Sequence, residues 1–197
     1  AVLRRGKYLS LMLKGGERLM VHLRMTGAFL AVKKGESLPP FARWGLILSG
    51  AYDLWMTDIR TFGTAALYQE GEPLDKGFEA LGPEPLDDAM TGTYLKERAR
   101  HKKTQVKPFI LDQSIIAGLG NIYADESLFA AGIRPTKRVS RMTKKEWERL
   151  AIAIKEVIQS ALSHHGTTFR NYQDADGKMG DNFRYLKVYH RGGKPCP

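Results

Sequence analysis

Apolar and polar residues alternate along the first 70 positions, which is the period-two pattern of half-buried β-strands. In the first strand predicted by this pattern, Lys7 heads a row of leucines that share one face. The glycine pair that follows predicts a hairpin. Together the segments indicate an antiparallel sandwich or partial barrel. The predicted strands cover residues 7–13, 19–25, 28–32, 44–48, 54–57 and 64–68.

The pattern changes after residues 71–85, a stretch rich in Gly and Pro that predicts a linker. Beyond it, apolar residues recur every three or four positions, as on one face of a helix. Thr104 is expected to cap a short helix, and Thr143 with Glu146 has the spacing of a capping box. The predicted helices cover residues 88–100, 104–111, 121–131 and 144 to about 165, with a polar loop over 167–183 and a last strand at 185–189.

The charge of the chain narrows the class of partner. Its 31 lysines and arginines against 21 aspartates and glutamates give a formal net charge of +10. Such an excess favours a polyanionic partner, nucleic acid first and an anionic membrane surface second. No apolar run is long enough to span a bilayer, and the first residues carry no secretory signal. Both ends resemble the interior of a longer protein, so we expect an internal fragment.

A glycine-rich turn contains the first candidate site. Gly118 and Gly120 precede a helix that begins at Asn121, so backbone amides would be exposed at a positive helix end. Lys102, Lys103 and Lys107 place three cations just before this turn, and together these groups could hold one or two phosphates. Equally, the glycines could serve close packing alone, with the lysines solvated.

Two more candidates lie in the β-rich half. Lys7 heads an apolar row, where partial burial would lower the pKa of its amine and make it a usable proton carrier; a strand-end lysine with a solvated tip is the alternative. Arg60 and Phe62 lie two positions apart, so an extended loop would point both the same way, a combination suited to insertion into a nucleic-acid stack. Alternatively, Phe62 belongs to a core beside an Asp58–Arg60 surface pair, and Met25 is equally typical of a core.

Metal and thiol chemistry is sparse. The five histidines show no metal-ligand spacing, and the single cysteine, Cys196, excludes an internal disulfide. One cysteine could begin a zinc knuckle but cannot complete a zinc site. A single cysteine also fits a reducing compartment.

Several segments, in this order, resemble bacterial formamidopyrimidine-DNA glycosylase, a family of base-excision repair enzymes. The pairing of HLRMTG with an Arg-x-Phe loop is similar to this family rather than to its relative endonuclease VIII. The matching segments are RRGKYLSL (4–11), HLRMTG (22–27), TDIRTFG (57–63), LGPEPL (81–86), KKTQVKPFILDQ (102–113), AGLGNIYADESLFAAGIRP (117–135), HGTT (165–168) and VYHRGGKPC (188–196).

The resemblance implies an α+β multidomain fold, in which an antiparallel β-sandwich lacking its N-terminal strands precedes a helix–two-turn–helix DNA-binding domain and the start of a zinc finger. It divides the chain into a sandwich (1–75), a linker (76–86), the helical domain (87–166), a loop that closes over the extruded base (167–184) and the start of a zinc-finger hairpin (185–197). One zinc ion per full-length protein is implied, with Cys196 as a ligand. A monomeric, cytoplasmic bacterial protein without a membrane partner is expected.

The resemblance also implies the chemistry. Enzymes of this family flip an oxidised purine such as 8-oxoguanine out of duplex DNA, cut its glycosidic bond through an N-terminal proline and nick the strand by β- and δ-elimination. Lys7 matches the lysine that donates a proton in β-elimination. Met25, Arg60 and Phe62 match the trio that fills the gap left by the flipped base. DNA-binding positions are matched by Arg60, Lys102, Lys107 and Asn121.

This chain departs from the family pattern in several places. The catalytic Pro-Glu start is absent, Phe41 stands where many members have a DNA-contacting histidine, and His190 replaces a glycine. Three of the four zinc cysteines are also absent, so a truly truncated chain is predicted to lack glycosylase activity. A non-catalytic module that recognises damaged or abasic DNA is the alternative function. A basic RNA- or ribosome-binding protein explains the charge but not Met25, Arg60 and Phe62.

Overall fold

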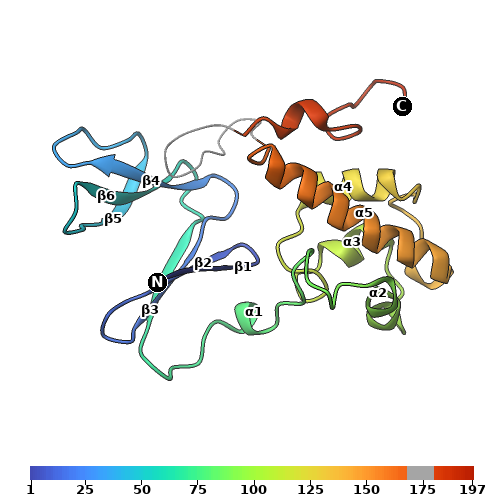
Figure 1. The fold of residues 1–197 in the computed structure, drawn as a ribbon, viewed down its shortest axis with the longest axis horizontal. Coiled ribbons are helices and arrows are strands. Elements are labelled where there is room, and N and C mark those ends of the chain that lie inside the picture. Colours follow the sequence, from blue (N-terminus) through green and yellow to red (C-terminus); the bar gives the residue numbers. More distant parts are fainter. Residues whose placement is uncertain (168–179) are drawn as a thin grey trace. The chain divides into compact units, whose positions relative to one another are not determined.

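The computed structural model describes residues 1–167 and 180–197 (Figure 1). By internal contacts the chain divides into two compact units. The sheet unit comprises Ala1–Pro73 with His164–Phe183, and the helical unit comprises Leu74–Ser163 with Arg184–Pro197. Most of the loop expected to close over the base falls at 168–179, outside the described residues. The boundaries between sandwich, linker, helical domain, loop and zinc-finger hairpin that the resemblance implies stay a prediction.

The sheet unit contains two antiparallel sheets, which confirms the predicted strand class. The four-stranded sheet has the order β1-β2-β3-β7 and the three-stranded sheet the order β4-β6-β5. Buried positions on these strands are few, and most are apolar: Leu11, Met20, Val21, Ala28 and Met56, with Ser10 and Asp58 as the polar exceptions. The strands are β1 (Val2–Arg5), β2 (Tyr8–Met12), β3 (Arg18–His22), β4 (Gly27–Lys33), β5 (Ala42–Leu46), β6 (Tyr52–Asp58) and β7 (Thr64–Tyr68).

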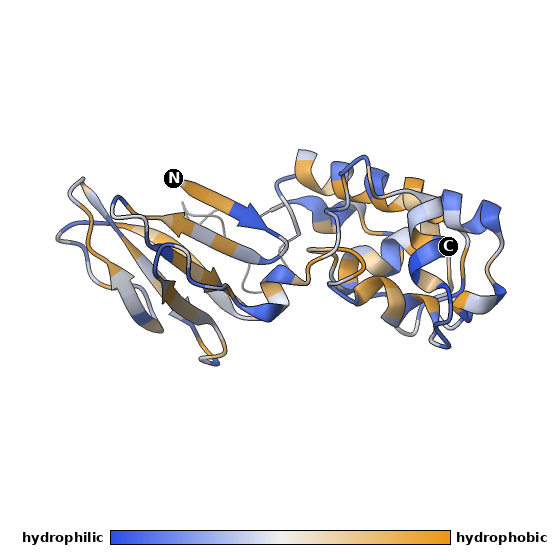
Figure 2. Ribbon diagram, turned by 90° about the horizontal axis from the view of Figure 1, so that it is seen from below, coloured by the Kyte–Doolittle hydropathy of each residue, from blue (hydrophilic) through white to orange (hydrophobic). Residues whose placement is uncertain are grey.

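Lys7 was predicted to begin a strand, and this prediction is wrong. Arg5 pairs with Tyr8, so β1 and β2 are joined by a two-residue turn made of Gly6 and Lys7. Gly6 has a φ of 56°, which glycine adopts without steric cost. Lys7 therefore lies in the turn and does not head the leucine row. Figure 2 shows β1 running from apolar residues to the basic pair that precedes this turn.

The helical unit contains most of the predicted helices with adjusted ends. Gln105 rather than Thr104 is the N-cap of α3, and no side chain caps that end among the described residues. The short helix α1 lies within the stretch predicted as a linker. The helices are α1 (Lys76–Glu79), α2 (Gly92–Ala99), α3 (Val106–Leu111), α4 (Asn121–Ala130), α5 (Lys144–Ser163) and the 3₁₀ turns η1 (Val139–Arg141) and η2 (Asn182–Tyr185).

The last predicted strand, at 185–189, is wrong. The chain forms η2 there and then a turn, because the amides of Lys187, Val188 and Tyr189 all donate to the Glu126 carboxylate. Successive amides of an extended strand point to opposite sides, so they cannot converge on one acceptor. A buried acid on a different helix thus determines the local conformation.

The long helix α5 organises the core of the helical unit. Its capping box forms as predicted: the Thr143 amide donates to Glu146 Oε2 at 2.8 Å, and the Glu146 amide donates to Thr143 Oγ1 at 3.3 Å. Trp147 in the first turn is buried and meets Phe109 of α3 edge-on, with ring centroids 5.6 Å apart. The predicted apolar stripe ends early, because Leu162 is exposed.

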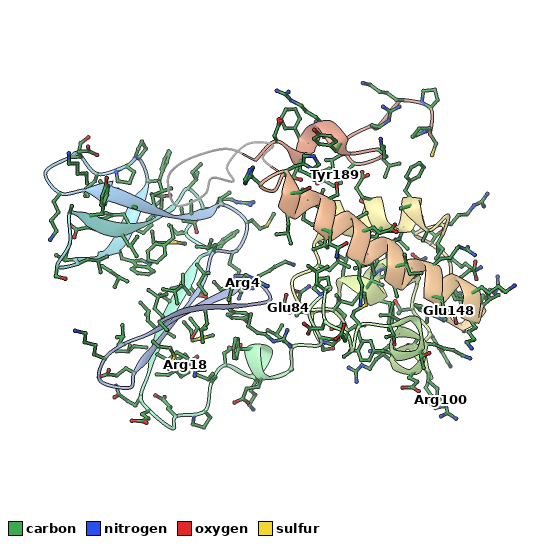
Figure 3. All side chains as sticks on the ribbon, viewed as in Figure 1. Arg4, Arg18, Glu84, Arg100, Glu148 and Tyr189 are labelled. Atoms are coloured by element: carbon green, nitrogen blue, oxygen red, sulfur yellow. The ribbon has the colours of Figure 1, made fainter. Side chains whose placement is uncertain are left out.

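Helix α2 approaches α5 closely enough to require a glycine. A Cβ at Gly92 would lie 2.6 Å from the backbone nitrogen and Cα of Glu148, which is labelled on α5 in Figure 3. Contacts this short are essentially never seen in proteins. The backbones of α2 and α5 therefore meet at this point with no side chain between them.

Candidate nucleic-acid interface

Asp58, at the end of β6, organises the loop that contains Arg60 and Phe62. Its side chain is buried, with 2% of the residue exposed. Oδ1 accepts hydrogen bonds from the Thr26 hydroxyl and from the Arg60 amide at 3.1 Å, and Oδ2 accepts from the Gly63 amide at 2.7 Å. Burial alone would raise the pKa of Asp58, but these hydrogen bonds and one from the Phe62 amide lower the pKa to about 2.

The Met56 side chain brings the loop that contains Arg60 and Phe62 beside the loop that contains Met25. The Met56 methyl group lies where a Cβ at Gly27 or Gly63 would fall, 2.6 Å and 2.3 Å from those two positions. Each glycine ends one of the two loops, so both loops close over the same buried methyl. The Thr26–Asp58 hydrogen bond then joins the loops directly.

The three side chains expected to enter DNA lie on these loops and are exposed. Met25 is 73% exposed and Phe62 is 57% exposed, and the guanidinium carbon of Arg60 lies 5.6 Å from the centre of the Phe62 ring. The alternative of a core Phe62 beside an Asp58–Arg60 surface pair is therefore wrong, because Asp58 is buried and its carboxylate binds backbone amides. Their exposure leaves all three side chains available to a partner.

Lys7 lies at the tip of the β1–β2 turn. The residue is exposed, yet the surrounding protein removes part of the water around its amine, and this desolvation lowers its pKa from the usual 10.5. A lysine with a lowered pKa gives up a proton more readily than an ordinary surface lysine. The lowered pKa has the direction expected for Lys7, its position in a turn differs from the strand predicted, and its role stays a prediction.

The glycine-rich turn before α4 is fixed by Gln113. Its amide nitrogen donates to the carbonyls of Leu111 and Leu119 at 2.9 and 3.0 Å, and its carbonyl accepts from the Gly118 amide at 2.9 Å. Gly118 has a φ of 81°, a conformation that favours glycine. Gly120 is the N-cap of α4 and has no side chain to cover the first amides of the helix.

Lys107 lies in α3, and Asn121 is the first residue of α4. Asp125 is one helical turn after Asn121 on α4, so both share one face. The Lys107 amine is bound to Asp125, with Nζ–Oδ distances of 2.7 and 2.9 Å, which places it beside that face. Lys102 pairs instead with Asp112, at the C-terminal end of α3, at 3.8 Å. Two of the three lysines predicted as solvated or phosphate-bound, Lys102 and Lys107, thus have an acidic neighbour.

Glu126 is a structural residue that the sequence reading missed. It is 5% exposed and accepts three amides, from Lys187 at 2.7 Å, Val188 at 2.9 Å and Tyr189 at 2.7 Å. Tyr189 is labelled in Figure 3, on the C-terminal segment beside α4 and α5. An acid among the small and apolar residues of α4 was the only signal that could have revealed this contact.

The described residues do not form a metal site. Cys196 is exposed, and within residues 1–167 and 180–197 no three His, Cys, Asp or Glu side chains group to hold an ion. Cys196 could supply one thiolate to a zinc ion, and a zinc site needs more ligands than the described residues bring to it. Phe41, at the position of the family histidine, is exposed and has a φ of 62°. In the described ranges, no helix is long and apolar enough to cross a membrane.

Comparison with protein-family models matches both halves of the chain. The formamidopyrimidine-DNA glycosylase N-terminal domain matches residues 1–65, and the formamidopyrimidine-DNA glycosylase H2TH domain matches residues 81–173. Curated relatives named formamidopyrimidine-DNA glycosylase cover nearly the whole chain. The one from Desulforamulus reducens is 43% identical over 98% of this chain and 70% of its own length, and the one from Cronobacter sakazakii is 41% identical over 100% and 72%.

Solved structures agree. The MutM (Fpg) protein of Thermus thermophilus matches with a TM-score of 0.91 and 36% identity, over 100% of this chain and 73% of that one. The Fpg of Lactococcus lactis, solved with abasic-site DNA, matches with a TM-score of 0.90 and 31% identity, over 100% and 72%. The sequence, the fold and these matches together show that the chain belongs to the formamidopyrimidine-DNA glycosylase family of DNA glycosylase/AP lyases.

Proposed function

We propose that this protein removes oxidised purines, 8-oxoguanine and formamidopyrimidines, from duplex DNA and nicks the strand by β,δ-elimination. The observation that carries the proposal is the exposure of Met25, Arg60 and Phe62 on two loops that share one buried carboxylate. An apolar wedge with one cation can enter the base stack and contact the base left unpaired by flipping. A glycosylase has to fill that gap, because an empty one would let the damaged base return.

The helical unit would supply the sequence-independent grip. Lys107, Lys102 and Asn121 are proposed to contact phosphates, which hold the duplex in register without reading its sequence. Among the described residues Gly120, the N-cap of α4, makes no side-chain capping bond, and this supports the proposal because a helix N-terminus favours an anion. The net charge of +10 adds a general attraction for the duplex.

Lys7 would donate the proton in β-elimination. Desolvation lowers its pKa, so the ammonium gives its proton to a leaving group more readily than an ordinary lysine does. The family's covalent intermediate is a Schiff base between an N-terminal amine and the sugar. Lys7 is not needed to form that bond, so its loss should affect strand nicking more than covalent capture.

Borohydride trapping tests the proposal. The protein with its native N-terminus is incubated with duplex containing 8-oxoguanine opposite cytosine and reduced with borohydride. A covalent protein–DNA band is expected for the wild type and for Lys7→Arg, whereas β-elimination by Lys7→Arg should slow about 100-fold. Binding of a lesion duplex without any trapped band would instead establish the non-catalytic damage-recognition module.

The remaining features are proposed for the whole protein. One zinc ion is expected, with Cys196 as a ligand, and Cys196→Ser should reduce the zinc content measured by elemental analysis. A monomer is expected from light scattering. Since its substrate is chromosomal DNA, the protein is expected at the bacterial nucleoid.

A further inference from the structure

One buried carboxylate is bonded to both loops that hold the DNA-facing side chains. We propose that Asp58 is a positioning residue that holds the Met25 loop and the Arg60–Phe62 loop together as one rigid wedge. The proposal rests on the proposed function, because it assigns a role to Asp58 in the recognition of damaged DNA. Asp58 does not itself reach the DNA, since it is buried beneath the loops.

The hydrogen bonds fix both ends of the Arg60–Phe62 loop. The Asp58 carboxylate accepts the amide of Arg60 at 3.1 Å and the amide of Gly63 at 2.7 Å, so the loop begins and ends on the same side chain. Thr61 between them has a φ of 56°, an uncommon conformation for a non-glycine residue. Its neighbours must hold such a conformation in place.

Arg43 fixes the start of the loop from the neighbouring strand. Its Nε donates to the Asp58 carbonyl at 2.7 Å and a terminal nitrogen donates to the Ile59 carbonyl at 3.4 Å. Arg43 thus holds the backbone of Asp58, and the side chain of Asp58 holds the loop. Both the backbone and the side chain of Asp58 are therefore fixed by hydrogen bonds.

The Thr26 hydroxyl transmits this order to the Met25 loop. Thr26 follows Met25 directly and donates to Asp58 Oδ1. On the opposite side of Met25, Arg24 has a φ of 55° and its amide donates to His22 Nδ1 at 3.0 Å. Without the Thr26 bond, the Met25 loop would keep the hydrogen bond from the Gly27 amide to the Leu23 carbonyl at 3.0 Å and the pairing of Gly27 with Asp58. It would lose the side-chain hydrogen bond that ties the residue next to Met25 to the carboxylate holding the Arg60–Phe62 loop.

Rigidity matters because the wedge works against base stacking. Inserting apolar side chains costs a few kcal/mol of unstacking. Loops that were mobile before binding would add the cost of ordering their side chains. Loops that Asp58 already holds in place avoid the cost of ordering. Because the side chains enter the stack only where a base has left it, this gain in affinity applies to damaged duplex and not to undamaged duplex.

Thr26→Val tests the link with a minimal change. It removes the hydroxyl but keeps a branched side chain, and it leaves the amide bonds of Arg60 and Gly63 to Asp58 intact. The matched control is Thr26→Ser, which keeps the hydroxyl. Affinity is measured for duplexes with a stable abasic analogue and for undamaged duplexes of the same sequence, and 2-aminopurine beside the site reports insertion into the stack.

We expect Thr26→Val to weaken binding of the abasic duplex about fivefold to tenfold, the cost of ordering a side chain that is no longer held before binding. Binding of undamaged duplex should hardly change, and the unfolding midpoint should fall modestly because a hydrogen bond to a buried carboxylate is lost. The 2-aminopurine response should fall, and Thr26→Ser should restore it. Two results would overturn the proposal. Thr26→Val could bind the abasic duplex as tightly as the wild type does, or the variant could lose affinity for the abasic and the undamaged duplex by the same factor.

Hydrogen exchange separates this proposal from the proposed function. If Asp58 positions the loops, Asp58→Asn should speed amide exchange at Arg60 and Gly63 in the free protein, whatever the protein does to DNA. Unchanged exchange at both amides would contradict the positioning role. A wild type that binds abasic and undamaged duplexes equally would contradict the proposed function, and the exchange result would still decide the role of Asp58 in ordering the loops.

Discussion

Lys107 of α3 and Asp125 of α4 form an ion pair, with the lysine Nζ 2.7 Å from one carboxylate oxygen and 2.9 Å from the other. Both side chains are about three-quarters buried, at 30% and 23% exposed. Asp125 therefore aims the amine along the face of α4 that carries Asn121 and also neutralises part of its charge. A phosphate that binds Lys107 has to share it with Asp125.

Changing either member of this pair should move duplex affinity in opposite directions. Lys107→Ala removes a cation and should weaken binding of damaged and undamaged duplexes alike, with the slope of log affinity against log salt reduced by about one. Asp125→Asn removes the competing anion and should strengthen binding of both duplexes. Fluorescence anisotropy over a range of salt concentrations measures both effects.

Lys155→Ala on α5 is the control for overall charge, because it removes one cation outside the glycine-rich turn. It should change affinity less than Lys107→Ala does. A loss confined to damaged DNA in Lys107→Ala would contradict its assignment as a backbone contact.

Glu126→Gln should loosen the C-terminal segment without unfolding the helical unit. The amide side chain keeps one acceptor, so at least one of the three amides at 187–189 loses its partner in a buried place. Exchange of these amides should speed by about tenfold or more, while exchange within α5 stays as in the wild type. Equal protection of the three amides in variant and wild type would show that the segment is held by other contacts.

The capping box predicts an acid dependence of stability. Hydrogen bonds from Lys137 and Thr143 hold the pKa of Glu146 at about 2, below its usual 4.5. A lowered pKa in the folded state means that Glu146 stabilises the fold above pH 4.5 and that this contribution is lost as the pH falls towards 2. Glu146→Gln should therefore lower the unfolding free energy by about 1–2 kcal/mol at pH 7.

The difference between Glu146→Gln and the wild type should shrink steadily below pH 4.5. Urea unfolding at a series of pH values gives both curves. A difference that is the same at pH 7 and pH 2.5 would mean that Glu146 acts through packing rather than through its charge.

Gly92→Ala should separate α2 from α5. The added methyl would meet the backbone of Glu148 at 2.6 Å, and backbone cannot swing away as a side chain can. We expect a loss of about 2–3 kcal/mol, the upper part of the range for overpacking. Gly192→Ala is the matched control, because nothing lies within 4 Å of its Cβ position. Urea denaturation of both variants tests the difference.

The sequence predicts those strands and helices that are determined by residues close together in the chain. Alternation located the strands, and the Thr143–Glu146 spacing located the start of α5, because each depends on residues within a few positions of one another. The turn at Gly6 and Lys7 was missed because the apolar alternation runs through it, and only the positive φ of Gly6 interrupts the strand.

The roles of the buried acids could not be predicted. Asp58 looked like a surface partner of Arg60, because neither its burial nor its contact with Thr26, 32 positions earlier, is visible in the local pattern. Glu126 looked like any helical acid, because its partners lie far away along the chain. The carboxylate oxygens of Glu126 accept hydrogen bonds from amides about 60 positions later in the chain. By contrast, exposure of Met25 and Phe62 followed from the family resemblance, whereas their residue types alone were equally typical of a core.

The low pKa of Asp58, about 2, has a consequence for enzymology. The carboxylate stays ionised throughout the neutral and mildly acidic range, so the loops it fastens keep one shape there. Any change of activity with pH across that range then has to come from groups that exchange protons during turnover, rather than from a change in how the duplex is engaged.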